Sequence, residues 1–336
     1  MKGRVVFAVS KAGDPGGRHR ILPLYRELKS RGVQCSYTGV PRGAWGRILF
    51  FLRLFGTDLL VLHKKLFGPA QLWLIRLLCR KIIFDFDDAI MFVEDRWKKP
   101  VTGKYVSKFR DTVKASDAVV AGNEFLAAQA RLTNEKVAVL TTPVDTGKYV
   151  PAGRAKRHGV TVGWIGMKGN LFYLEGLSDV FKGLARKYPD FSLSIICNDF
   201  VEFDGVRVNK RVWSEQDEAR LLQELDIGVM PLNDDLWSRG KCGFKILQYF
   251  SVGIPVVASP VGINSDIVEH GVNGFLATSP DEWDKYLSAL IGDEALRKRM
   301  GAAGRRTVEE KYSLERYMER YLSIIEGPGD KTWAGR

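Results

Sequence analysis

The most constraining feature of this chain is the stretch of residues 239–277, where the residue types predict a loop, a helix, a strand and a second loop. Gly240 and Gly243 let the backbone approach a ligand closely, and residues 244–252 then have the composition of a helix. The N–H groups and the positive dipole end at the start of such a helix attract an anion. The stretch therefore predicts a phosphate site.

The residues that follow place this site in a sheet. Lys241 and Lys245 add positive charge at the start of the expected helix. Gly253 is a helix stop, and residues 254–258 are an apolar, β-branched run typical of a buried parallel strand. The next loop, which contains Gly262, would emerge at the carboxyl edge of the sheet, where open α/β proteins bind ligands.

This stretch resembles the donor-binding signature of the retaining glycosyltransferases of family 4. The resemblance extends to residues 226–232, which look like the preceding strand, and to residues 271–276, which look like the following turn. Upstream, residues 121–124 and 142–145 are similar to the end of the family's first domain. The resemblance implies an α/β protein of the GT-B fold, in which two Rossmann-like domains with parallel sheets face each other across a cleft.

Strands alternate with helices along the chain, and 336 residues suffice for two such domains. A segment at 143–158 mixes Pro, Gly and charges and predicts the linker. We therefore expect an acceptor-side domain at 1–150 and a donor-binding domain at 151–312. The resemblance implies that the remaining 313–336 contain a helix, at 314–326, that crosses back to the first domain. Expected strands are 5–9, 35–38, 59–62, 82–86, 118–121 and 137–140, then 160–165, 193–197, 227–230 and 254–258. Expected helices include 21–31, 70–78 and 171–187.

The first turn of the expected second domain supplies a further lysine for the phosphates. The family has an arginine just after this strand and a Lys-Gly pair a few residues later. Lys168 and the glycine after it match the pair, whereas Trp164 stands where the arginine is expected. The resemblance implies that the departing diphosphate is stabilised by Lys168, Lys245 and the amides of Gly243 and Phe244.

Two acidic residues of the family signature are missing. The family carries two glutamates separated by seven residues, and Gly240 and Gln248 occupy those positions here. Gln248 can still accept from and donate to a ribose diol. Gly240 offers no side chain, so the sugar contact must come from elsewhere, with Lys241 and the backbone of residues 243–244 as candidates. A non-catalytic relative is the alternative interpretation.

A glycine-bearing loop follows the first expected strand. Gly16 and Gly17 can turn backbone N–H groups toward an anion, and Arg18 and Arg20 can form forked bonds to phosphate. In the resembled family this loop approaches the donor from the acceptor-side domain. The expected donor contacts are Gly16, Gly17, Arg18, Gly166, Lys241, Gly243, Phe244, Gln248 and Gly262.

Acidic residues and a histidine end two strands of the expected first sheet. Asp87 and Asp88 follow residues 82–86, and His63 follows residues 59–62. In a GT-B protein these aspartates would hold an acceptor hydroxyl or the donor sugar, and His63 could exchange a proton. The alternative is a divalent-metal site at Asp85 and Asp87, which the other main glycosyltransferase fold uses. A metal-independent phosphate site makes that alternative weaker.

Positive charge is concentrated at the start of the chain. Residues 1–80 hold fifteen Lys and Arg against three Asp and Glu, so they account for the whole net charge of +12. Within residues 41–55, Arg47 and Arg53 accompany Trp45 and other large apolar side chains. Two interpretations stay open: a helix on an anionic membrane, where each basic residue contributes about 1 kcal/mol, or a helix packed on the sheet. No nucleic-acid recognition pattern occurs, so no nucleic acid is expected as a partner.

The remaining observations fit a protein of a reducing compartment. Cys35, Cys79, Cys197 and Cys242 show no CxxC spacing. No apolar run reaches the roughly 20 residues of a spanning helix, and no export signal is found. We expect a cytoplasmic protein, with peripheral association at the inner face of the membrane as an open possibility.

The expected activity is sugar transfer, with retention, from a nucleotide diphosphate sugar to a glycan or lipid-linked acceptor, in polysaccharide, lipopolysaccharide or glycolipid synthesis. No cofactor or metal is expected, because lysines and backbone amides would stabilise the leaving group. The absence of GKS, GxGxxG and GxSxG patterns argues against nucleotide hydrolysis, dinucleotide binding and serine hydrolysis. A sugar-nucleotide epimerase of the same fold and a non-catalytic nucleotide-sugar-binding relative are the alternatives.

Overall fold

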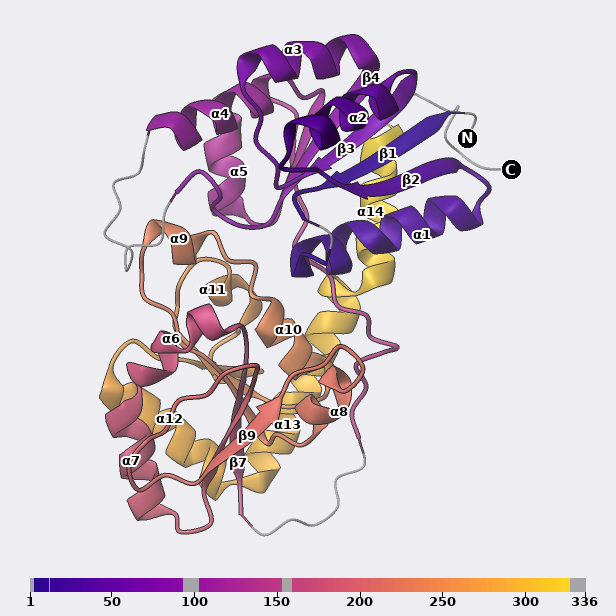
Figure 1. Cartoon of the computed structure of the whole chain (residues 1–336). Coiled ribbons are helices and arrows are strands. Elements are labelled where there is room, and N and C mark those ends of the chain that lie inside the picture. The colour runs from indigo at the N-terminus through magenta and orange to yellow at the C-terminus, as the bar shows by residue number, and fades with distance from the viewer. Residues whose placement is uncertain (1–2, 12, 93–102, 153–158, 327–336) are drawn as a thin grey trace. The chain divides into compact units, whose positions relative to one another are not determined.

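The computed structural model describes residues 3–11, 13–92, 103–152 and 159–326. Within them the chain forms two α/β units, each built on a six-stranded sheet in which all paired strands are parallel (Figure 1). The first unit comprises residues 1–143, 235–242 and 315–336, and the second comprises 144–234 and 243–314. Residue 12 of the glycine loop, residues 153–158 of the expected linker and 327–336 of the expected last segment lie outside the described residues.

The first sheet has the strand order β2-β1-β3-β4-β5-β6. Its strands are β1 (Arg4–Val9), β2 (Gln34–Gly39), β3 (Thr57–His63), β4 (Cys79–Phe86), β5 (Ala118–Ala121) and β6 (Val137–Val139). Its helices are the π-helical turn η1 (Gly17–Ile21), α1 (Leu22–Ser30), α2 (Ala44–Leu54), α3 (Pro69–Leu78), α4 (Gly103–Lys114), α5 (Glu124–Arg131) and α14 (Leu314–Glu326). The short α9 (Leu236–Arg239) also belongs to this unit.

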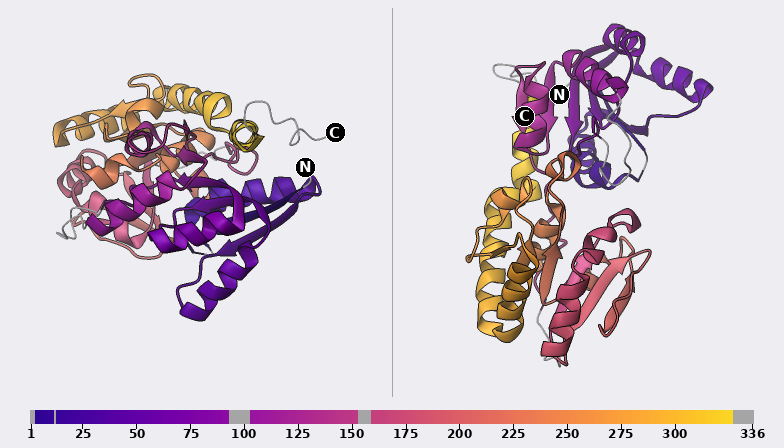
Figure 2. Two further views of the ribbon diagram at one scale, coloured as in Figure 1. Left: turned by 90° about the horizontal axis from the view of Figure 1, so that it is seen from above. Right: turned by 90° about the vertical axis from the view of Figure 1, so that its left-hand side faces the viewer.

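Alternation along the strands divides the first sheet into two buried faces. Leu60 and Leu62 of β3 pack in a core with residues of α2 and α3 such as Phe50 and Ile75. The side chains of alternate positions, including His63, point to the opposite face of the sheet. That face carries η1, α1 and α14, and Figure 2 gives two further views of these helices.

The second sheet has the strand order β12-β11-β10-β7-β8-β9. Its strands are β7 (Thr161–Ile165), β8 (Ser192–Cys197), β9 (Val208–Val212), β10 (Ile227–Met230), β11 (Val256–Ala258) and β12 (Gly274–Leu276). Its helices are η3 (Lys168–Asn170), α6 (Phe172–Glu175), α7 (Ser178–Lys187), α8 (Glu218–Gln223), α10 (Phe244–Ser251), α11 (Asn264–Ile267), α12 (Pro280–Gly292), α13 (Glu294–Thr307) and η4 (Val308–Tyr312).

Two sequence predictions are corrected by this unit. The expected continuous helix at 171–187 is wrong, because it divides into α6 and α7 around Gly176, a poor helix former next to the buried Leu177. The expected strand at 254–258 is too long. Pro255 has no N–H to give the ladder, and the strand begins at Val256. β9 and β12 were not expected as strands: β9 is polar at its centre and largely exposed, and β12 has only three residues.

The expected helix around Arg47 and Arg53 is α2, and its buried side packs on the first sheet through Phe50 and Leu54. Among the helices in the described part of the chain, none is both long and apolar enough to cross a membrane.

Candidate functional site

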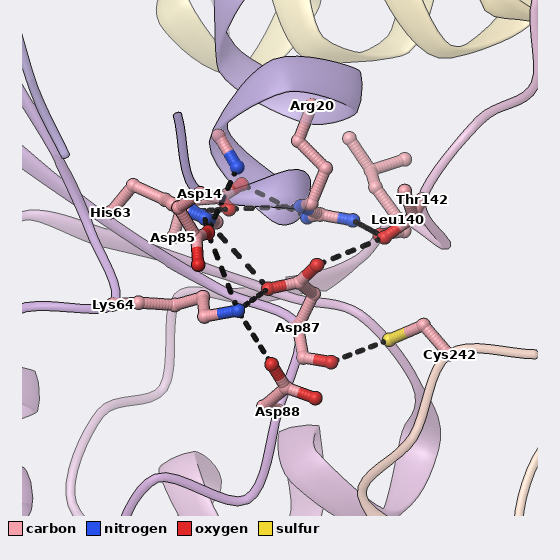
Figure 3. Close-up of polar contacts among 11 residues, drawn as sticks. Asp14, Arg20, His63, Lys64, Asp85, Asp87, Asp88, Leu140, Thr142 and Cys242 are labelled. Carbon is pink, nitrogen blue, oxygen red and sulfur yellow. Dashed lines mark hydrogen bonds and ion pairs between the residues drawn. The ribbon is translucent and has the colours of Figure 1, made fainter. Parts of the chain in front are cut away.

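Polar side chains of the first unit gather where β3 and β4 end. His63 and Asp85 are register partners on these neighbouring strands, so their side chains leave the same face of the sheet side by side. Lys64 directly follows the end of β3, and Asp87 directly follows the end of β4. Figure 3 shows how these side chains converge with others from η1 and the loop before it. We call the set Asp14, Arg20, His63, Lys64, Asp85, Asp87 and Asp88 the edge cluster.

A buried ion pair lies at the back of the edge cluster. Arg20 and Asp85 are both fully buried, and the guanidinium donates two bonds of 2.9 Å to the two carboxylate oxygens. Arg20 also donates to the carbonyl of Leu140 at 2.6 Å (Figure 3). Burial alone would lower the pKa of Arg20, but the charge of Asp85 outweighs it and the pKa is raised. The sequence prediction that Arg20 binds phosphate is therefore wrong, because its fork is already occupied.

Lys64 neutralises the front of the cluster. Its Nζ lies 2.5 Å from Asp88, 3.2 Å from Asp87 and 3.5 Å from Asp14. Burial would lower the pKa of Lys64, yet the three carboxylates, Asp87 first, hold it well above its usual value. The backbone of Lys64 has φ +54°, a left-handed conformation that is uncommon for a side-chain-bearing residue and often marks a functional site.

His63 sits between acids on both sides. Its Nδ1 lies 2.9 Å from Asp85, and because a carboxylate only accepts, this nitrogen carries a proton. Its Nε2 lies 3.5 Å from Asp14 and 3.8 Å from Asp87. Burial would lower the pKa of His63, but bonds to Asp14 and Asp85 and the charge of Asp87 raise it.

The cluster keeps unused bonding capacity despite its burial. Among the described residues, His63 Nε2 and Asp87 Oδ1 have no hydrogen-bond partner of good geometry. Four carboxylates face only two fixed cations, which leaves a formal charge of −2 with His63 neutral and −1 with it protonated. Asp88 is the most exposed carboxylate of the set, at 33%. An acidic edge of this kind suits hydroxyl groups, to which carboxylates accept and a charged imidazole donates.

The glycine loop packs directly on this cluster. A Cβ at Gly16 would lie 2.6 Å from Asp87 and 3.0 Å from His63, so only glycine fits there. The amide of Gly17 donates to Asp14 at 3.1 Å. Gly16 and Gly17 were expected to face donor phosphates. Gly16 instead lies against Asp87 and His63, and Gly17 lies against Tyr37 and Val9. Arg18 approaches His19 at 2.8 Å.

Residues 239–242 belong to the first unit, although the sequence pattern joined them to the following helix. The side-chain amide of Asn123 donates to the carbonyls of Arg239 and Lys241 at 3.0 and 2.9 Å. Cys242 Sγ donates to the carbonyl of Asp87 at 3.0 Å. A Cβ at Gly240 would lie 2.5 Å from the Ala89 side chain and 2.8 Å from its backbone N. The family glutamate is therefore excluded sterically at this position.

The expected phosphate helix of the second unit is α10. Gly243 precedes it with φ +62°, and a Cβ there would lie 2.5 Å from Ile267. Lys245 Nζ lies 5.5 Å from the ring centre of the buried Trp164, within cation–π range. A Cβ at Gly166 would touch both that ring and Lys245. Trp164, which replaces the expected arginine, thus forms the surface on which Lys245 rests.

The other residues expected to contact the donor lie in separate local environments. Lys168 is exposed and pairs with Asp199 at 2.6 Å. Gln248 is buried, and its amide donates to the Tyr149 hydroxyl, which in turn bonds Glu218. Gly262 adopts φ +56° in the loop after β11. Lys241 places its Nζ 5.7 Å from the Trp237 ring in the first unit.

Reasoning from strand ends located His63, Asp87 and Asp88, but Asp14 and Lys64 were missed. The signal for Lys64 was its place directly after His63 at the end of a strand. Among the residues that the structure describes, no group of three or more His, Cys, Asp or Glu is arranged to hold a metal ion. The aspartates of the alternative metal site are instead paired with Arg20 and Lys64.

Comparison with known proteins identifies the class. Residues 161–293 match the family model for glycosyl transferases group 1. Sucrose-phosphate synthase from Thermosynechococcus elongatus has the same fold, with a TM-score of 0.74 at 12% identity over 96% of this chain and 98% of the other. Anabaena Alr3699/HepE in complex with UDP and glucose gives a TM-score of 0.71 at 14% identity over 96% and 99%. The expected α/β GT-B fold is confirmed.

Curated relatives align over part of the chain. An uncharacterized glycosyltransferase of Haemophilus influenzae is 27% identical over 169 residues, which is 47% of either chain. Glycosyltransferase 1 domain-containing protein 1 of Xenopus tropicalis is 23% identical over 161 residues, 44% of this chain and 45% of the relative. Spore coat protein SA of Bacillus subtilis matches over 24% of this chain and 22% of its own. The matched region thus spans less than half of each of these relatives.

We predict that His63 stabilises the fold in a pH-dependent way. Its folded pKa is raised, so the stabilisation is fully present below the unfolded value near 6.5 and is lost as pH rises through the folded pKa. The difference in urea midpoint between wild type and His63→Gln should therefore shrink from pH 6 to pH 9. A difference that grows with pH would contradict a charged His63.

We predict that restoring a side chain at Gly240 destabilises the protein. Gly240→Ala forces its Cβ into Ala89, and overpacking of this kind costs about 1–3 kcal/mol. Gly240→Glu should cost more. Gly183→Ala is the matched control, because its Cβ meets nothing within 4 Å. The measurement is the melting temperature, and an unchanged value for Gly240→Ala would show that the site has room.

Proposed function

We propose that this protein is a retaining glycosyltransferase of family 4 that uses a nucleotide diphosphate sugar as donor. The observation that carries the proposal is the amino end of α10, where Gly243 turns the backbone with φ +62° directly before the helix and Lys245 is held on Trp164. This end lies inside the part of the chain that matches glycosyl transferases group 1. HepE of the same fold binds UDP and glucose, which supports a nucleotide-linked donor.

The proposed chemistry needs charge stabilisation more than covalent catalysis. As the sugar–phosphate bond breaks, negative charge develops on the diphosphate, and groups already oriented toward it lower the barrier. In this proposal Lys245, Lys168 and the dipole of α10 supply that stabilisation. The departing phosphate takes the acceptor's proton, so no carboxylate nucleophile is required.

The edge cluster of the first unit is proposed to bind hydroxyl groups of the acceptor or of the donor sugar. Asp88 and Asp87 would accept from hydroxyls, and His63 would donate from Nε2, which has no hydrogen bond of good geometry among the described residues. Lys64 and Arg20 occupy the positions between the carboxylates where a divalent cation would otherwise be needed. We therefore propose that the reaction is metal-independent.

We propose a glycan or lipid-linked acceptor and a cytoplasmic enzyme that meets it at the inner face of the membrane. The support is the concentration of the whole net charge of +12 in residues 1–80. Polysaccharide, lipopolysaccharide and glycolipid synthesis are the processes that consume such acceptors.

Removal of the Lys245 charge should weaken donor binding and transfer. In Lys245→Met the apolar stem still covers Trp164, but the charge is lost, and turnover should fall at least tenfold, or about 1.4 kcal/mol in the barrier. Calorimetry with UDP, GDP, ADP and dTDP identifies the bound nucleotide and measures its affinity in each variant.

The matched control is Lys285→Met, which removes an exposed lysine of α12. It should behave as wild type. Equal nucleotide affinity and equal turnover in Lys245→Met and wild type would remove Lys245 from the proposed mechanism. Conversion of the donor sugar without any acceptor would favour an epimerase.

A further inference from the structure

Large apolar side chains of the first unit lie exposed on two neighbouring helices. On α2 they follow the spacing i, i+3, i+4 and i+7, which places them on one side of the helix. The turn after α2 and the adjacent α3 add three more. We call this set the α2–α3 face: Trp45, Ile48, Leu49, Leu52, Phe55, Trp73 and Leu77. Trp45 is 81% exposed and Phe55 is 73% exposed.

The fold does not need these side chains. The opposite side of α2 already packs in the core through Phe50 and Leu54, and α3 does so through Leu72 and Ile75. Contiguous exposed apolar patches are uncommon on proteins that stay alone in water, and they mark interaction surfaces. The α2–α3 face is therefore available to a partner.

Basic residues accompany the face. Arg42 precedes α2 and is exposed, and Lys65 lies half-buried in the loop before α3. Arg47, two residues after Trp45, is half-buried on the side of α2 that carries Phe50 and Leu54. Burial lowers the pKa of Lys65, and the positive charges of Arg47, Arg42 and Lys108 lower it further. These groups lie close enough to repel one another, so an anionic partner would relieve that repulsion.

We infer that the α2–α3 face docks on an anionic lipid bilayer, with its tryptophans and leucines in the interfacial layer and Arg42 and Lys65 at the headgroups. Trp favours the membrane interface, and basic residues beside an amphipathic helix bind anionic lipid. A second copy of the chain is a poorer occupant, because two identical faces would bring the same positive charges together. The inference gives the proposed peripheral association a defined surface, and vesicle binding tests it without any turnover.

The test is co-sedimentation of the full chain with vesicles of phosphatidylcholine alone and with added phosphatidylglycerol. Wild type should bind the anionic vesicles at least tenfold more tightly. The triple variant Trp45→Ser, Leu49→Ser, Leu52→Ser should lose at least tenfold in affinity for them. The double variant Arg42→Gln, Lys65→Gln should lose at least tenfold as well, and added salt should weaken wild-type binding.

Matched controls remove an exposed leucine or exposed basic residues that lie outside the α2–α3 face. Leu132→Ser changes an 80% exposed leucine after α5. The triple variant Lys285→Gln, Lys298→Gln, Arg299→Gln removes three exposed basic residues of α12 and α13. Both controls should bind vesicles as wild type does.

Three results would overturn the inference: equal vesicle binding by wild type and the face variants, no preference of wild type for anionic vesicles, or a dimer in solution that the apolar variant dissociates. Melting temperatures and circular dichroism spectra like those of wild type show that each variant is folded. Nucleotide binding without vesicle binding would leave the proposed transferase standing and remove the docking surface. Vesicle binding without nucleotide binding would leave the docking surface standing and remove the proposed transferase.

Discussion

The buried carboxylate of Asp85 imposes the constraint on which the first unit depends. A fully buried charge must be paired, and removal of one partner from such a pair costs about 3–5 kcal/mol. Arg20 pairs with Asp85 through two hydrogen bonds and also donates a hydrogen bond to the carbonyl of Leu140. The pair joins η1, which carries Arg20, to β4, which carries Asp85. The bond to Leu140 adds the residue that directly follows β6. Asp85 also lies within hydrogen-bond distance of His63 Nδ1 and so orients the imidazole ring.

The remaining charges of the edge cluster follow from that arrangement. Because Arg20 pairs with Asp85, the more exposed Asp87 and Asp88 form their ion pairs with Lys64 instead. The pKa values of Asp85 and Asp87 are lowered by these charges, and the cations come from the chain itself. Apart from these pairs, bonding capacity is left at His63 Nε2 and Asp87 Oδ1 within the described residues. Under the proposed function, this acidic edge would bind hydroxyl groups, and the lysine-bearing end of α10 would bind the donor's phosphates.

Much of this could be predicted from the sequence where the physics is local. Strand runs and their polar ends predicted the two parallel sheets and placed His63 and Asp87 at one edge. Contacts between distant positions could not be predicted. Asp85, the partner of Arg20, lies 65 residues further along the chain. The sequence near Gly240 does not indicate that Ala89 fills the space beside it. The left-handed backbone of Lys64 is likewise set by tertiary structure.

The central claim is that the chain supplies its own cations, Lys64 at the edge cluster and Lys245 at α10, so that donor binding needs no metal. The most direct test is calorimetric binding of the preferred nucleoside diphosphate to the full chain in EDTA and in excess Mg²⁺ or Mn²⁺. A ligand that binds the folded state stabilises it, so melting temperatures provide a second readout. We predict equal affinity in both buffers. Binding that occurs only with the metal would contradict the account and restore a metal site at Asp85 and Asp87.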